Sequence, residues 1–355
     1  MSELVDILKN KVVHGELYRE IACGRVQCFA CAHTCAIADG EAGICRMRFN
    51  RGGALYVPCG YVSGMQCDPI EKKPFFHFLP GAGAFSYGML GCNFKCDYCQ
   101  NWVTSQTLRD PESLAFPMAT SPTGMVAIAH AQGADVIVST YNEPLITTEW
   151  NVSVFKTAKA AGLMTAYVSN GYGTPESLQY LHPWIDAYKV DLKSFNDDNY
   201  RALGGRLSPV LETIRGLRDM KVWVEIVTLL VPGFNDSPKE LSELTAFIAG
   251  ISTDIPWHVT AFHGNYKRTG SVNTAAGDLL RAVEIGKRNG LRFVYAGNLA
   301  GRLQNLENTY CPGCGRLLVE RYGFAILRNN LSETSRCPSC KRDIPGIWSR
   351  NMNQG

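Results

Sequence analysis

The 355-residue sequence has no long apolar run and almost no net charge. Its longest apolar stretches, such as 222–232, are about half as long as the roughly 20 residues that cross a bilayer. A formal charge of +3 is too small to predict binding to nucleic acid or to an anionic membrane. The first eleven residues include Glu3 and Asp6 and lack the apolar segment of a signal peptide. We therefore expect a cytoplasmic protein with no membrane or nucleic-acid partner.

Cysteine, by contrast, is abundant, with 14 residues that fall mainly into three groups. In a cytoplasmic chain thiols stay reduced, so closely spaced cysteines favour metal sites over disulfides. The groups are Cys28, Cys31, Cys35 and Cys45; Cys92, Cys96 and Cys99; and Cys311, Cys314, Cys337 and Cys340. They predict three regions: a Cys-rich metal-binding segment at 1–84, a core at 85–300 and a C-terminal segment at 301–355.

The core alternates short apolar segments with amphipathic ones. Apolar segments largely unbroken by charge are typical of strands buried on both faces, and we predict them at 85–91, 136–140, 165–170, 188–192, 222–231, 258–262 and 293–296. Ser121, Thr174 and Ser237 each precede a proline and are expected helix N-caps, with Glu240 completing a capping box. Six strand–helix units with right-handed crossovers predict an α/β fold, a partial (β/α)6 barrel of the TIM type, with its chemistry at the strands' carboxyl ends.

Cys92, Cys96 and Cys99 follow the first predicted strand, so they belong on a loop at this catalytic rim. A structural zinc site normally has four protein ligands. A cubane cluster with only three protein thiolates leaves one iron open to an outside ligand. The spacing therefore favours a [4Fe–4S] cluster, and a zinc site completed by a distant ligand is the alternative.

Cys-x3-Cys-x2-Cys after the first barrel strand, with the aromatic Tyr98 before the last cysteine, resembles the signature of radical SAM enzymes. In that superfamily S-adenosylmethionine (SAM) chelates the open iron. One electron cleaves it to methionine and a 5′-deoxyadenosyl radical that abstracts hydrogen. The resemblance implies that the three cysteines are the catalytic cluster ligands and that Tyr98 lies against the adenine. Similar motifs at later strand ends imply further SAM contacts: Asn142 and Glu143 at the ammonium, Ser169 and Asn170 at the ribose or carboxylate, Asp191 and Lys193 at the methionine end, and His263 near the adenine.

Each of these strand-end residues also has a structural interpretation. Asp191 and Lys193 could form a plain ion pair at the rim, His263 could be a satisfied structural histidine, and the asparagines could be turn residues. Two departures stand out. The superfamily's Gly-Gly-Glu-Pro is Tyr-Asn-Glu-Pro here, and strand 222–231 lacks the arginine with which glycyl-radical activating enzymes contact SAM.

The outer cysteine groups predict closed metal sites. The C-terminal CxxC…CxxC pattern is typical of a structural zinc ribbon, with an additional Fe–S cluster as the alternative. In the N-terminal group, zinc and a second cluster both fit the four thiols, with Cys23 and His33 in reserve. Lys72, Lys73 and His77 lie in a segment that could close over the core site or form a solvated basic turn.

The flanking motifs narrow the resemblance to the radical SAM component of the AmmeMemoRadiSam system, a relative of pyruvate formate-lyase activating enzymes. These motifs are Cys28-x2-Cys31-x-His33-x-Cys35, Gly43-x-Cys45-Arg46, residues 68–78 and Cys99-Gln100-Asn101-Trp102. They imply Memo-like and AMMECR-type partners; we also expect an external reductant such as flavodoxin or ferredoxin. We expect radical hydrogen abstraction from an unidentified small molecule. The alternatives are activation of a protein glycine and a non-enzymatic, zinc-rich binding module.

Overall fold

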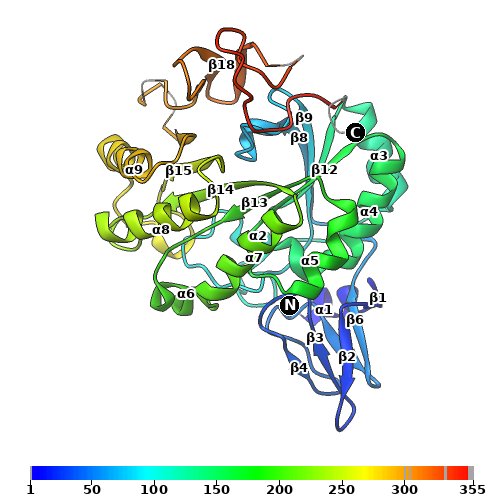
Figure 1. The fold of residues 1–355 in the computed structure, drawn as a ribbon. Helices are drawn as coiled ribbons and strands as arrows, with labels where there is room; N and C mark the ends of the chain where they lie inside the picture. The colour runs from blue at the N-terminus through cyan, green and yellow to red at the C-terminus, as the bar shows by residue number, and fades with distance from the viewer. Residues whose placement is uncertain (1, 300, 304, 332–333, 351–355) are drawn as a thin grey trace.

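One eight-stranded sheet organises the computed structural model of the chain (Figure 1), which describes residues 2–299, 301–303, 305–331 and 334–350. The strand order is β16-β15-β14-β13-β12-β11-β9-β8. Neighbouring strands from β9 to β16 run parallel, and β8 pairs antiparallel with β9. The strands are β8 (Gly64–Pro69), β9 (Gly83–Gly88), β11 (Val136–Ser139), β12 (Met164–Ser169), β13 (Ala187–Asp191), β14 (Trp223–Leu230), β15 (Trp257–Ala261) and β16 (Val294–Gly297).

The predicted partial barrel is confirmed, and each predicted strand is present with its ends shifted by a few residues. Every residue of β11 and β15 is buried, as expected for strands covered on both faces. Helix α4 packs on β11 and β12, α7 on β14, and α9 on β15 and β16. The helices are α1 (Ser2–Lys9), α2 (Trp102–Ser105), α3 (Pro122–Ala131), α4 (Thr148–Ala160), α5 (Pro175–Leu181), α6 (Asp197–Leu203), α7 (Leu207–Asp219), α8 (Pro238–Ile251) and α9 (Ala276–Arg288). Within the described ranges, every helix is too short or too polar to traverse a lipid bilayer.

Helix starts follow the predicted caps. The side chains of Ser121, Thr174 and Ser237 each accept a hydrogen bond from a backbone N–H in the first turn. The capping box predicted between Ser237 and Glu240 is wrong in one of its two hydrogen bonds, the one from the Ser237 backbone N–H to the Glu240 side chain. The Glu240 carboxylate instead accepts from Phe195 N at 2.8 Å and from the Ser194 hydroxyl, because the loop after β13 offers these donors. Glu240 thereby ties α8 to the carboxyl end of β13.

The N-terminal region, blue in Figure 1, forms two small three-stranded sheets that project from one end of the barrel. Their strands are β1 (Val12–His14), β6 (Ala54–Pro58) and β5 (Phe49–Arg51), and β2 (Tyr18–Ile21), β3 (Arg25–Cys28) and β4 (Ala36–Ile37); β7 (Tyr61–Val62) pairs separately with β10 (Met118–Ala119). The proposed region boundary at 84/85 falls inside β9 and leaves its partner β8 in the N-terminal region. Sequence analysis did not predict β8, whose residues are half-exposed or exposed and follow no regular alternation.

The C-terminal strands β17 (Thr309–Tyr310), β18 (Leu317–Tyr322) and β19 (Ala325–Asn329) form an antiparallel sheet, orange to red in Figure 1. This sheet packs on Phe76 and Tyr295 in a shared apolar cluster. His77 is fully buried at this junction, where its ring nitrogens lie 2.6 Å from Pro345 O and 2.6 Å from the Tyr295 hydroxyl. His77 therefore neither closes over the core site nor lies in a solvated turn, because its buried ring is committed to the C-terminal segment.

Candidate active site

A cavity of about 440 Å³ lies at the carboxyl ends of the parallel strands and within the barrel. This volume is within the range of small-ligand sites. Its walls come from the loop after β9, the ends of β11 to β16, residues 72–74 and one residue of the C-terminal sheet. The predicted site residues that line it are Cys92, Cys96, Tyr98, Cys99, Asn142, Glu143, Ser169, Asn170, Asp191 and Lys193. The structure thus gathers ten residues that are scattered over about a hundred positions of the chain.

The cysteine loop begins with a turn that only glycine fits. Gly91 has φ +87°, and a Cβ there would lie 2.4 Å from the Met47 side chain. Within the loop, Cys92 Sγ accepts from Phe94 N at 3.3 Å, and Cys99 Sγ lies 3.1 Å from Ser105 Oγ. No other cysteine of the described chain lines this cavity, so three thiols are available to a group bound there.

The loop after β11 contains a residue other than glycine in a backbone conformation that glycine favours. Tyr141 has φ +69°, in the left-handed region that glycine favours. Asn142 closes the loop onto the neighbouring strand, because its Oδ1 accepts from Met89 N at 3.0 Å. A Cβ on Gly88 would meet Thr140 O at 2.6 Å, so β9 and this loop touch through backbone. These contacts fix the path of the backbone into Glu143.

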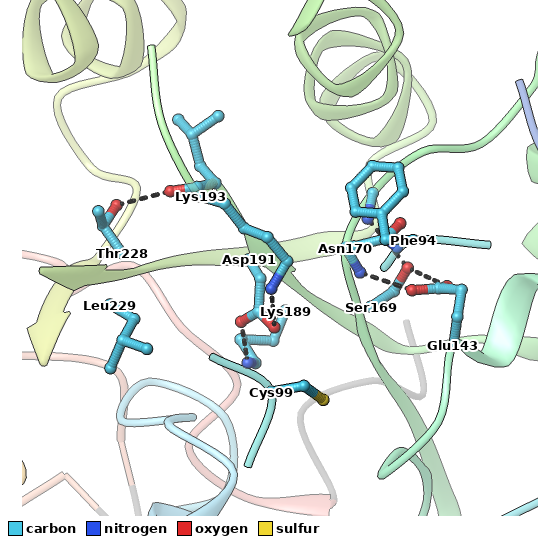
Figure 2. A network of polar contacts seen from close by, with 12 residues as sticks. Phe94, Cys99, Glu143, Ser169, Asn170, Lys189, Asp191, Lys193, Thr228 and Leu229 are labelled. Carbon is cyan, nitrogen blue, oxygen red and sulfur yellow. Dashed lines mark hydrogen bonds and ion pairs between the residues drawn. The ribbon is translucent and has the colours of Figure 1, made fainter. Parts of the chain in front are cut away.

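Glu143 joins two strand ends (Figure 2). Its carboxylate accepts from Ser169 Oγ at 2.7 Å, Asn170 N at 2.8 Å and Leu145 N at 3.0 Å. Burial raises the pKa of Glu143 to about 7, although these hydrogen bonds oppose the shift. A carboxylate offers about four acceptor positions. One position therefore remains for a donor in the cavity.

Asp191 lies between two lysines at the end of β13 (Figure 2). Lys189 Nζ contacts its Oδ1, and Lys193 Nζ lies 3.6 Å from its Oδ2. Burial raises the pKa of Asp191, but the two ammonium groups outweigh it and hold that pKa below its ordinary value. Two cations against one carboxylate leave one positive charge facing the cavity. Sequence analysis missed Lys189, although its i, i+2 spacing places it on the same strand face as Asp191.

Of the two residues predicted to contact the adenine, one lies in the cavity wall and the other lies outside it. Tyr98 is buried in the cavity wall, with its ring edge-on to Phe234 at 5.8 Å between centroids. His263 is exposed and does not belong to the cavity lining, and its Nε2 lies 3.3 Å from Asn298 O. Asn298 and Phe324 do line the cavity. Phe324 comes from the turn between β18 and β19, and no pattern in the sequence connects that turn with the barrel.

The outer cysteine groups form two different arrangements. The sulfur atoms of Cys311, Cys314, Cys337 and Cys340 all lie within 4.8 Å of one another. The Cys311–Cys340 and Cys314–Cys337 separations are 3.5 and 3.6 Å, close to the roughly 3.8 Å between thiolates that are each about 2.3 Å from one zinc ion. The N-terminal thiols Cys28, Cys31, Cys35 and Cys45 instead surround a small separate cavity.

Comparison with known proteins identifies the family. The profile of the radical SAM superfamily matches residues 87–245. An uncharacterized protein of Methanocaldococcus jannaschii is 36% identical over 330 residues, which cover 92% of this chain and 97% of that protein. The chain belongs to the radical SAM superfamily. It is thus a radical SAM enzyme, and membership implies SAM and an iron–sulfur cluster as its cofactors.

This radical SAM enzyme is also similar to two further proteins. The pyruvate formate-lyase-activating enzyme of Listeria monocytogenes is 27% identical over 188 residues, covering 50% of this chain and 75% of that enzyme. The predicted relation to activating enzymes is therefore confirmed. Among solved structures, a radical SAM methyltransferase from Sphaerobacter thermophilus aligns with a TM-score of 0.49 at 16% identity, over 68% of this chain and 71% of that chain.

The residues of the barrel cavity fit these cofactors. Three thiols in one wall match a cluster that keeps one iron open. The same cavity is lined by Lys189, Asp191 and Lys193, whose paired charges suit a zwitterionic amino acid group such as the methionine end of SAM.

Proposed function

We propose that this radical SAM enzyme holds a [4Fe–4S] cluster on Cys92, Cys96 and Cys99 and cleaves SAM reductively to a 5′-deoxyadenosyl radical, which abstracts hydrogen from a small molecule. One observation carries the proposal. The three thiols line the same cavity as the charged group Lys189, Asp191 and Lys193. A cluster with an open iron needs the thiolates, and the zwitterionic methionine end of SAM needs the paired charges. Both sets of residues are present within this one site.

The surrounding residues bind and orient SAM. The excess positive charge of Lys189 and Lys193 attracts the methionine carboxylate, and the free acceptor position of Glu143 takes the ammonium. Ser169 and Asn170, both fixed by Glu143, face the ribose or carboxylate, and the Tyr98 ring lies against the adenine. When bound, the cluster supplies the single electron for cleavage.

The cavity walls limit the access of water to the radical. Lys73 is held by Asp68 at 3.2 Å and by the Tyr141 hydroxyl at 3.3 Å, so residues 72–74 form a fixed wall. A reactive intermediate survives only where solvent is kept out. We extend the proposal to partners: a flavodoxin or ferredoxin as electron donor, and Memo-like and AMMECR-type proteins as associates.

Anaerobic reconstitution with iron and sulfide, followed by dithionite and SAM, tests the proposal. We expect 5′-deoxyadenosine from the native chain and from Cys59→Ala, whose thiol lies outside the cavity. Cys96→Ala should give none. If the native chain yields no more product than Cys96→Ala, the proposed chemistry is wrong.

The relation to activating enzymes supports a second candidate, in which the substrate is a protein glycine. EPR of a candidate partner after incubation would then show a stable glycyl radical, which a small-molecule substrate would not give.

A further inference from the structure

The N-terminal thiols converge from three backbone segments. Cys28 ends β3, Cys31 and Cys35 lie in the turn before β4, and Cys45 precedes β5. The turn is closed by backbone hydrogen bonds from Cys28 N to Cys35 O at 3.0 Å and from Thr34 N to Cys31 O at 3.0 Å. All four thiols line one cavity of about 10 Å³. The fold therefore builds a four-thiol site before any group is bound.

The spacing of these thiols differs from that of the C-terminal zinc-like set. Among the described residues, only Cys311, Cys314, Cys337 and Cys340 gather as a compact group of ligand atoms. Thiolates about 2.3 Å from one zinc ion touch each other and leave no void between them. The N-terminal thiols surround a separate cavity, and no three of their sulfur atoms all lie within 4.8 Å of one another. Thiolates of a cubane sit on separate irons and are held farther apart, which agrees with this arrangement.

Hydrogen-bond donors already point at two of these sulfur atoms. Arg48 Nε donates to Cys28 Sγ at 3.2 Å, and Ile44 N donates to Cys35 Sγ at 3.5 Å. Arg48 is 1% exposed and pairs with the buried Glu149 at 2.6 Å. A guanidinium donates far more strongly to a thiolate than to a neutral thiol. Donors to cluster sulfur atoms are also a means by which proteins set reduction potential.

The four-thiol site is in contact with the SAM-site loop. His33, between Cys31 and Cys35, places its Nε2 3.0 Å from the carbonyl oxygen of Asn93. Asn93 directly follows Cys92, and the Asn170 Nδ2 donates to its Oδ1 at 2.7 Å. A single side-chain contact, from His33 to Asn93, therefore connects the two cysteine loops.

We infer that Cys28, Cys31, Cys35 and Cys45 bind a second [4Fe–4S] cluster, which passes single electrons to the SAM-site cluster. The electron-transfer part rests on the proposed function. In each transfer the second cluster is oxidised by one electron and the SAM-site cluster is reduced by one. A low-potential one-electron donor, dithionite in the test, then reduces the second cluster again.

The site is tested in a full-length chain that carries Cys92→Ala, Cys96→Ala and Cys99→Ala together, so the outcome does not depend on SAM cleavage. After anaerobic reconstitution we expect about four iron atoms per chain and an EPR signal on reduction with dithionite. Adding Cys35→Ala should abolish both, and adding Cys23→Ala, an exposed cysteine outside the cavity, should change neither. Absence of iron from the triple variant, with zinc bound at both outer cysteine groups, would overturn the inference.

Electron transfer between the two clusters is tested by a separate measurement. In the native chain with both clusters reduced, EPR should show spin–spin broadening that is absent from the triple variant and from Cys35→Ala. Two independent, unbroadened signals would overturn the relay while leaving the second site intact. Loss of SAM cleavage with iron still at both sites would contradict only the proposed function.

Discussion

The Glu143 carboxylate accepts a hydrogen bond from Ser169 Oγ at 2.7 Å and so ties the end of β11 to the end of β12. The same carboxylate accepts from the backbone of Asn170, the next residue. One buried group thus sets the relative position of two strand ends that face the cavity. Its raised pKa, about 7, means that its charge changes near neutral pH.

Glu143 gives SAM binding a pH dependence. If the ionised carboxylate takes the SAM ammonium, affinity should rise as pH increases from 6 to 8, through the pKa of about 7. Glu143→Gln should lower the affinity at pH 8 by about tenfold, equivalent to about 1.4 kcal/mol, and flatten this dependence. Calorimetric titration with SAM at several pH values measures both effects. An equally steep profile in Glu143→Gln would assign the titration to another group.

Lys189, on the same strand face as Asp191, should contribute to SAM binding. Lys189→Met keeps the length of the side chain and removes the charge beside Asp191. We expect SAM affinity to fall by about 10- to 150-fold, since a buried charge-assisted contact is worth roughly 1.5–3 kcal/mol. Lys287→Met, on the exposed face of α9, is the matched control and should bind SAM normally. Equal affinity in both variants would place the methionine carboxylate elsewhere.

Sequence patterns predicted the parallel core well because buried strands and capped helices are local signals. Strand β11 (Val136–Ser139) is short, mostly apolar and followed by a turn, so its burial can be predicted from its own residues. The polar residues at strand ends were found for a related reason, since parallel strands bring their carboxyl ends to one rim.

The remaining features depend on contacts between distant residues. Strand β8 has no alternation of its own and exists through its pairing with β9. His77 lies within a basic segment, yet its environment is set by Pro345 and Tyr295, more than two hundred residues away. Phe324 reaches the cavity only because the C-terminal sheet docks on the barrel. No local pattern records such long-range packing.

His77 should make stability depend on pH. Burial lowers its pKa from 6.5 to about 4, so the folded chain holds it neutral while the unfolded chain binds a proton below pH 6.5. Its contribution is therefore complete above about pH 6.5 and is lost as pH falls toward 4, by up to about 3 kcal/mol. Denaturant unfolding at stepped pH values should show this loss in the native chain and a smaller one in His77→Gln. Identical slopes would mean that other groups carry the acid sensitivity.

The C-terminal cysteine set should hold zinc that the sheet needs for its fold. Cys314→Ser removes one thiol of the compact set and should lower zinc content by one ion per chain. Because β18 packs on Phe76 and Tyr295, loss of the ion should also expose residues 309–331 to limited proteolysis. Cys67→Ser, outside every cysteine group, should retain zinc and resist the protease. Iron in place of zinc in the native chain would favour the alternative cluster.

We expect Phe324 to shield the radical from solvent and to contribute little to the stability of the fold. Its side chain is 49% exposed yet lines the cavity, so Phe324→Ala should change the free energy of unfolding by no more than about 0.5 kcal/mol. Truncation opens the wall of the barrel cavity to solvent at the C-terminal sheet. We therefore expect SAM cleavage without substrate to rise severalfold over the native rate, measured as 5′-deoxyadenosine under dithionite. Leu327→Ala, on the same sheet, 63% exposed and outside the cavity lining, is the control and should match the native chain. A Phe324→Ala chain with native uncoupled cleavage would show that the cavity is sealed by residues 72–74 without help from the C-terminal sheet.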